Sequence, residues 1–174
     1  YANGNLDDAL DRFQHIDPTT ELGYQAQYYI TQIKYNKGQF GDVISTGRQL
    51  LSEQKNNYFD AELNRLVGES YYHLGNDAQA RTYLRRYLDN PEGEPFRTAA
   101  YTMGVLEYRD GNYQEVVNDM LHVTDGADAL TQSAYLYLGQ AKRQLGDLNG
   151  ANMAFQQAAT MDCDRSVKET AYYN

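Results

Sequence analysis

Glycine recurs along this chain at nearly constant intervals, and this regularity restricts the possible folds more than any other feature. The glycines concerned are Gly4, Gly38, Gly75, Gly111 and Gly146, which are 34, 37, 36 and 35 residues apart. Each is followed by a polar residue suited to starting a helix, namely Asn5, Gln39, Asn76, Asn112 and Asp147. A period of about 34 residues is typical of repeated helix-turn-helix units. The spacing therefore predicts a helical hairpin with a turn at each glycine.

Apolar side chains repeat in step with these glycines. The clearest unit is Ala127 to Thr160, where Leu130, Ala134, Leu138 and Ala141 precede the turn and Ala151, Phe155 and Ala158 follow it. These spacings place each set on one helical face. Two helices joined by so short a turn lie antiparallel and bury these faces against each other. The remaining apolar surface requires neighbouring units, so the sequence predicts a stacked array.

A second series of glycines lies inside the predicted helices, seven residues before the turn. Its members are Gly68, Gly104 and Gly139. A glycine within a helix costs about 0.5–1 kcal/mol relative to alanine, so a shared position implies a packing reason. We expect each of them to contact the adjacent helix closely. The second unit departs from this pattern, with Thr31 at the glycine position and Gly47 where a large residue is expected.

The same signals give approximate boundaries. Helices are expected at 5–16, 19–37, 39–54, 57–74, 76–90, 94–110, 112–123, 127–145, 147–160 and 165–174. We interpret residues 1–174 as a single solenoid with units 1–18, 19–56, 57–93, 94–126, 127–163 and 164–174, the first and last of them partial. All three prolines, Pro18, Pro91 and Pro95, fall where one unit is followed by the next. Since the chain opens and closes in mid-repeat, we expect a piece of a longer array.

Composition and motifs argue against several classes of function. The formal charge is -9 and the cations are scattered, which disfavours nucleic acid as a partner. No apolar run reaches the roughly 18 residues needed to span a bilayer, so no membrane insertion is expected. His15, His73 and His122 lack the spacing of metal ligands, and GESYY at 68–72 lacks the closing glycine of a nucleophile elbow. We therefore predict no enzyme activity, no catalytic residue, no metal and no cofactor.

The repeating residues resemble the tetratricopeptide repeat family. The best unit matches the family signature at Tyr135, Leu138, Gly139, Gly146, Ala151, Phe155 and Ala158, and the third unit at Gly68, Tyr71, Gly75, Ala80 and Leu84. The resemblance implies an all-α fold, a right-handed α-α superhelix of stacked antiparallel helix pairs. It further implies that the first helix of each pair lines a concave groove, which in this family commonly holds a peptide or helix of a partner.

Transferred to this sequence, the resemblance implies a tyrosine-lined groove. Its predicted partner-binding residues are Tyr28, Gln32, Tyr35, Arg65, Glu69, Tyr72, His73, Tyr101, Tyr108, Arg109, Gln140 and Arg143. Tyr1 is expected at the same groove position as Tyr35. Tyrosine combines a large apolar ring with a hydroxyl, which suits protein recognition. The alternative is that these tyrosines bridge adjacent repeats and serve stability alone.

We accordingly expect a non-catalytic scaffold that binds another protein or a peptide segment. Two alternatives remain open at this point: a regulatory or substrate-presenting arm of a larger multidomain enzyme, and a self-association module. The short inserts between units resemble those of bacterial arrays in the cell envelope, which suggests a periplasmic location, with the cytoplasm as the alternative.

Overall fold

The computed structural model describes residues 3–53, 57–90 and 95–174, and most of these residues are helical. Contacts divide the chain into two compact units, Tyr1–Glu92 and Gly93–Asn174. The single solenoid over residues 1–174 and its division into six repeats stay predictions. Residues 1–2, 54–56 and 91–94 lie outside the described residues, and they include Tyr1 and Pro91.

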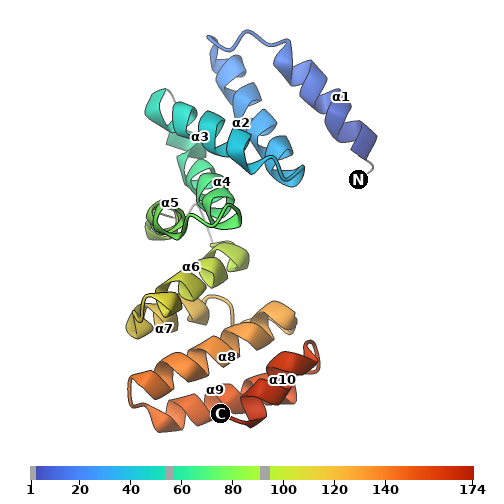
Figure 1. Cartoon of the computed structure of the whole chain (residues 1–174). Helices are drawn as coiled ribbons and strands as arrows, with labels where there is room; N and C mark the ends of the chain where they lie inside the picture. Colours follow the sequence, from blue (N-terminus) through green and yellow to red (C-terminus); the bar gives the residue numbers. More distant parts are fainter. Residues whose placement is uncertain (1–2, 54–56, 91–94) are drawn as a thin grey trace. The chain divides into compact units, whose positions relative to one another are not determined.

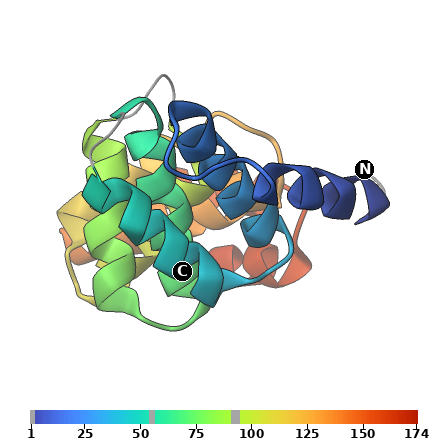
Figure 2. The same ribbon diagram turned by 90° about the horizontal axis from the view of Figure 1, so that it is seen from above.

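The first unit contains α1 (Asn3–Gln14), α2 (Glu21–Asn36), α3 (Phe40–Glu53), the short 3-10 turn η1 (Asn57–Phe59), α4 (Asp60–His73) and α5 (Asp77–Asp89). Each helix packs against the next, and α2 also contacts α4 (Figure 1). In both views the amino-terminal end of α1 extends away from the other helices of this unit (Figure 2).

The second unit contains α6 (Arg97–Arg109), α7 (Tyr113–Leu121), α8 (Ala129–Gln144), α9 (Leu148–Thr160) and α10 (Arg165–Tyr172). Here too each helix packs on its successor, while α8 contacts both α6 and α10. Helices α8 and α9 run antiparallel, with α10 beside them (Figure 1). All ten predicted helices are therefore present, with ends that differ by at most three residues from the predicted ones.

Four of the five predicted turns are confirmed as glycine elbows. Gly38, Gly75, Gly111 and Gly146 have φ values of 72°, 75°, 79° and 83°, in the left-handed region that glycine enters without a steric penalty. At each elbow the glycine N–H donates three residues back, as in Gly38 to Tyr35, and the next N–H donates five residues back, as in Gln39 to Lys34. This Schellman pattern satisfies carbonyl groups that the helix end leaves unpaired. The turn predicted at Gly4 is wrong, because Gly4 lies within the first turn of α1.

The glycines within the helices make the close contacts that the sequence predicts. A Cβ atom on Gly68 would lie 2.8 Å from Leu84 Cγ, and one on Gly139 would lie 2.5 Å from Phe155 Cε1. At Gly104 the nearest atom is Met120 Cε, at 2.7 Å. In each case the glycine of a first helix faces the large residue of the second helix, so only a missing side chain allows the pair to approach this closely.

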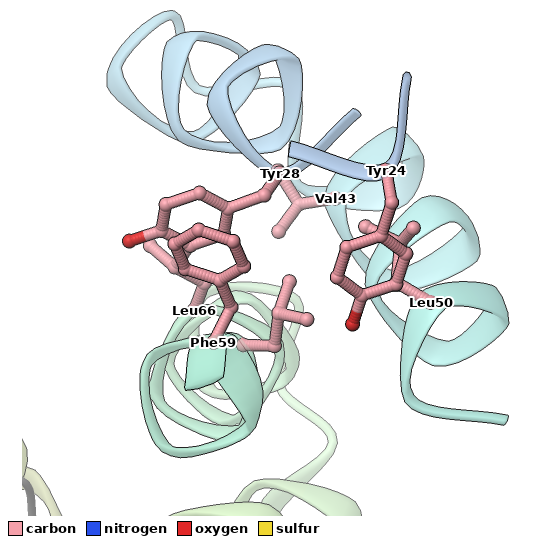
Figure 3. Close-up of a cluster of buried hydrophobic side chains, with 7 residues drawn as sticks. Tyr24, Tyr28, Val43, Leu50, Phe59 and Leu66 are labelled. Atoms are coloured by element: carbon pink, nitrogen blue, oxygen red, sulfur yellow. The ribbon is translucent and has the colours of Figure 1, made fainter. Parts of the chain in front are cut away.

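Tyrosines form part of the core of the first unit. Tyr24 and Tyr28 from α2 pack with Val43 and Leu50 from α3 and with Phe59, Leu63 and Leu66 from η1 and α4 (Figure 3). Gly47, which departs from the family pattern, leaves room for Val67 of α4. The core of this unit thus joins three successive helices.

Candidate functional site

The first helices of the pairs in the first unit, α2 and α4, place seven of the predicted groove residues on neighbouring elements. Tyr28, Gln32 and Tyr35 lie on α2, and Arg65, Glu69, Tyr72 and His73 lie on α4. We name the partly accessible members, Gln32, Tyr35, Tyr72 and His73, together with the ion pairs beside them, the α2–α4 face.

Arg65 is the centre of the charge network on this face. Its Nε donates to Glu62 Oε2 at 2.9 Å and its Nη1 donates to Glu69 Oε2 at 2.5 Å. Only 12% of the Arg65 side chain and 6% of the Glu69 side chain are exposed. The guanidinium carbon also lies 5.8 Å from the centre of the Tyr35 ring. Arg65 and Glu69 therefore bind each other, and the sequence did not predict this pairing.

The electrostatics of the network follow from burial and from the two carboxylates. Burial alone would lower the pKa of Arg65, but hydrogen bonding to Glu62 and the negative charges of Glu69 and Glu62 raise it above its ordinary value. Burial raises the pKa of Tyr35, and the charge of Glu69 and a hydrogen bond to it raise this pKa further. Arg65 thus remains charged and Tyr35 remains a neutral hydroxyl donor throughout the physiological range.

Tyr28 lies in the core of the first unit. Its side chain is 7% exposed, and its ring stacks on Phe59 with 4.1 Å between the ring centres. Its hydroxyl oxygen accepts a hydrogen bond from Gln32 Nε2 at 2.6 Å. Burial, followed by the charge of Glu62, raises the pKa of Tyr28 to about 12. Tyr28 therefore packs into the core of this unit, and its role in binding a partner stays a prediction.

An aromatic cluster occupies the elbow end of the α2–α4 face. The His73 ring stacks on Phe40, with 4.3 Å between the ring centres and 10° between the planes. The Tyr35 ring meets Phe40 edge-on at 5.8 Å. Tyr72 is half-buried and His73 is exposed. Phe40 was not among the predicted residues, although it stands two residues after the elbow glycine.

In the second unit, the corresponding first helices α6 and α8 bring tyrosines together. Tyr101 and Tyr108 of α6 both meet Tyr137 of α8 in edge-to-face contacts, with ring centres 6.0 Å and 5.2 Å apart. Tyr108 also meets Tyr113 edge-on at 5.7 Å. All four rings are half-buried. We name Tyr101, Tyr108 and Tyr137 the α6–α8 tyrosine face.

Neither Tyr113 nor Tyr137 was predicted. Tyr113 repeats the pattern of Phe40, since both are aromatic residues two positions after an elbow glycine and five after a tyrosine. This i, i+5 aromatic pair across the turn is the signal that could have identified them. Tyr137 has no such signal, because its counterparts in the other repeats are Tyr29, Leu66 and Thr102.

The three remaining predicted residues of the second unit are less closely grouped. Arg143 is exposed, donates to Asn174 Oδ1 at 2.8 Å and lies over the Phe155 ring at 5.7 Å. Arg109 is exposed at the end of α6, and Gln140 is half-buried on α8. Arg143 thus contacts the carboxamide after α10 and the second helix of its own pair.

Metal binding and membrane insertion find no support in the described residues. No group of three or more His, Cys, Asp or Glu side chains in residues 3–53, 57–90 and 95–174 could hold a metal ion. In the same part of the chain, no helix combines the length and the apolar character needed to cross a membrane.

Comparisons with known proteins agree on the fold. Residues 66–92 match the family model of the tetratricopeptide repeat. YrrB, whose structure is described as "a TPR protein with an unusual peptide-binding site", is 17% identical over 98% of this chain and 85% of its own, with a TM-score of 0.73. MamA is 14% identical over 98% of this chain and 86% of its own, with a TM-score of 0.66. A tetratricopeptide repeat protein from Parabacteroides merdae is 17% identical over 99% of this chain and 65% of its own, with a TM-score of 0.63. No curated protein sequence matches.

Proposed function

We propose that this chain, which has the tetratricopeptide-repeat fold, is a non-catalytic scaffold that binds a segment of another protein on the faces of its first helices. Proteins of this fold generally act as scaffolds for protein-protein interaction. YrrB, which shares the fold, is described as having a peptide-binding site. Both findings support a binding role, and the residues on the first helices support these faces as its location.

The observation that carries the proposal is the recurrence of half-buried tyrosine at one repeat position. Tyr35, Tyr72 and Tyr108 each stand three residues before an elbow glycine, on a first helix, and each is half-buried. In the α6–α8 tyrosine face, edge-to-face contacts hold three rings in place. Rings that are already ordered lose little conformational freedom when they bind a partner. Tyrosines held in this way provide apolar area together with hydroxyl groups that can orient a peptide.

The charges on the α2–α4 face support recognition without ion pairing to the partner. Arg65 is bound by Glu62 and Glu69, and the Tyr35 hydroxyl is bonded to Glu69. Breaking these buried pairs to bind a partner would leave charges without compensation and would cost several kcal/mol. We infer that the network fixes α2 and α4 relative to each other, while Gln32, Tyr72 and His73 contact the partner.

The test compares two triple variants in affinity capture from extracts. The first replaces Tyr101, Tyr108 and Tyr137 by alanine, and the matched control replaces the exposed Tyr58, Tyr172 and Tyr173. We expect the first variant to lose partners that the wild-type chain and the control retain, with the helical circular dichroism signal preserved. If the first variant captures the same partners, the three tyrosines are not needed for binding. If it loses its helical signal, they serve stability. Either result overturns the proposal.

The alternatives drawn from the sequence stay predictions, and separate measurements address them. Molecular mass by light scattering at several concentrations measures self-association directly. The sequence of the full-length gene product tests whether the chain is an arm of a larger multidomain enzyme, because a catalytic domain would be visible in it.

A further inference from the structure

A pocket of about 680 Å³ lies in the second unit, and none of the three residues of the α6–α8 tyrosine face lines it. It is lined by residues at the start of α6, at the end of α7, in the loop that follows and at the start of α8. These segments form the end of the α6–α7 hairpin opposite the Gly111 elbow. A volume of about 300–1,000 Å³ is usual for pockets that bind small molecules.

Apolar side chains line much of this pocket, and two of them are largely exposed to solvent. Pro95 and Phe96 line it beside α6, and Leu121 and Leu130 line it from α7 and α8. Phe96 and Leu121 are each 55% exposed. Large apolar side chains so exposed side by side mark surfaces that bind a partner. An apolar group that entered the pocket would remove both residues from water.

Arg97 makes one wall of the pocket rigid. Its Nη1 donates to Asp128 Oδ2 at 2.8 Å and its Nη2 donates to the Val123 carbonyl oxygen at 3.1 Å. The side chain of Thr131 also accepts from Nη2. These bonds connect α6 to the loop before α8, so the wall is already ordered before any ligand arrives. Such preorganisation reduces the entropy cost of binding.

The charges at the rim favour a cationic ligand. Two carboxylates, Asp125 and Asp128, surround the guanidinium of Arg97, which leaves one negative charge in excess. Both oxygens of Asp128 are bonded to Arg97 and one also accepts from the Thr131 N–H. Asp125 is 75% exposed and lies 3.1 Å from Arg97 Nε through one oxygen only. Asp125 therefore keeps acceptor capacity toward solvent, on a chain whose formal charge is -9.

We propose that this pocket binds a basic and apolar peptide segment of a partner protein: a bulky apolar side chain enters between Phe96, Leu121 and Leu130, and an adjacent lysine or arginine pairs with Asp125. This site shares no residue with the α6–α8 tyrosine face. Binding here can therefore be present or absent whatever the outcome for the proposed function.

The test is a nuclear magnetic resonance titration of the isotope-labelled full chain. The probe is the acetylated and amidated peptide Gly-Lys-Phe-Lys-Leu-Gly, and its twin carries glutamate in place of both lysines. We expect the basic peptide to shift the amide resonances of Phe96, Leu121 and Leu130. The acidic twin should bind at least about tenfold more weakly, because like charges then meet at the rim.

Matched variants locate the contacts. Leu121→Ser should weaken binding of the basic peptide roughly fivefold or more, since the apolar contact is lost, whereas Leu148→Ser, at a leucine that is 63% exposed outside the pocket, should not. Asp125→Asn should weaken it and Asp162→Asn should not, although both aspartates pair with a cation. Arg97 retains Asp128 in the Asp125 variant, so the helical signal should persist. The proposal is overturned if the three amides do not shift, if both peptides bind equally, or if control and pocket variants weaken binding alike.

Discussion

The three glycines inside first helices differ in what surrounds them, and this difference determines how well each tolerates a methyl group. At Gly68 an added Cβ would lie 2.9 Å from the backbone nitrogen of Leu84, which cannot move alone. At Gly104 it would meet the flexible end of Met120, at 2.7 Å from Cε. Overpacking of a rigid contact typically costs about 1–3 kcal/mol. A methionine end can rotate away at a smaller cost.

We therefore expect Gly68→Ala to lower the free energy of unfolding by about 1–3 kcal/mol, through overpacking against Leu84. Gly104→Ala should change it by less than about 1 kcal/mol, because the better helix propensity of alanine offsets a smaller steric cost. Urea denaturation of both variants measures the difference. Equal losses in the two variants would show that helix spacing adjusts as a whole and that the local neighbour does not matter.

The burial of Tyr28 should make the free energy of unfolding depend on pH in the alkaline range. Its pKa is raised to about 12 from an ordinary value of 10.0, so the unfolded chain releases this proton at lower pH than the folded chain. The contribution of the neutral hydroxyl to stability is complete below pH 10 and is lost as the pH rises toward 12. We expect the urea midpoint to fall over this window, and Tyr28→Phe, which cannot ionise, to reduce the fall. Tyr58→Phe, at an exposed tyrosine, is the control and should leave the alkaline fall as it is in the wild-type chain.

For single residues, the sequence predicted the helix face of a side chain better than it predicted its burial and its contacts. The packing of Gly68, Gly104 and Gly139 followed from their shared register, because an unfavourable helix residue repeated at one position implies a close helix contact there. The burial of Tyr28 did not follow, since it depends on the distance between α2 and the elements packed against it. The pairing of Arg65 with Glu62 and Glu69 was missed, although both pairs lie within α4 at spacings of three and four residues that the sequence shows. A face assignment from helical spacing identifies the side a residue is on, but the depth of its burial is set by the neighbouring repeat.

Between elements, polar side chains inside the protein connect one repeat to the next. Gln132 of α8 is fully buried, and its Nε2 donates to the carbonyl oxygens of Ala158 at 3.0 Å and Met161 at 2.9 Å. Its Oε1 accepts from the Asp164 N–H at 2.6 Å. One amide therefore satisfies the carboxyl end of α9 and the residue that caps α10. Sequence periodicity did not identify this connection, because the residue type at this position varies: the other repeats have Tyr24, Ala61 and Arg97 there.

We expect Gln132→Met to lower the free energy of unfolding by about 1–3 kcal/mol, since it leaves buried backbone groups of α9 and its following loop without partners. The amides of α10 should also exchange faster with solvent, because the cap at Asp164 is no longer anchored. Gln140→Met on the same helix is the control and should have little effect, as Gln140 is half-buried. If α10 retained its protection in Gln132→Met, the packing of Ala171 alone would be sufficient to hold it.

Helix starts were predicted with mixed success, and the reason is local hydrogen bonding. Asp147 caps α9 as expected, by accepting from the Gly150 N–H at 2.8 Å, and Asn76 accepts from the Gln79 N–H at 3.2 Å. Asn112, also expected to start a helix, makes no side-chain cap hydrogen bond at α7; its Nδ2 instead donates to Glu107 Oε2 at 2.7 Å. The side chain of a capping residue can form hydrogen bonds with several groups near the turn, and the sequence does not show which of these bonds it makes.

For the whole molecule, the predicted array implies that local stability is lower near the two ends of the chain than in its inner helices. In repeat proteins each repeat is stabilised mainly by its neighbours, so the first and last helices open before the inner ones. The pattern of burial agrees with this: residues 6–14 of α1 include no buried side chain, and α10 buries Ala171 alone. By contrast, α4 buries a continuous run from Leu66 to Tyr71, and α8 buries residues along most of its length.

We therefore expect amide hydrogen exchange to be fastest in α1 and α10 and slowest in α4 and α8, since exchange from the inner helices requires their neighbours to open first. Mass spectrometry of peptides from the intact chain measures this gradient, and each unit supplies its own internal comparison: α1 against α4, and α10 against α8. Gly68→Ala should increase exchange in α4 and α5 more than in α8 and α9, because the strain acts between adjacent helices. Uniform protection across each unit would instead indicate that its helices open together, as in a single cooperative core, and nearest-neighbour coupling would then be the wrong description of this chain.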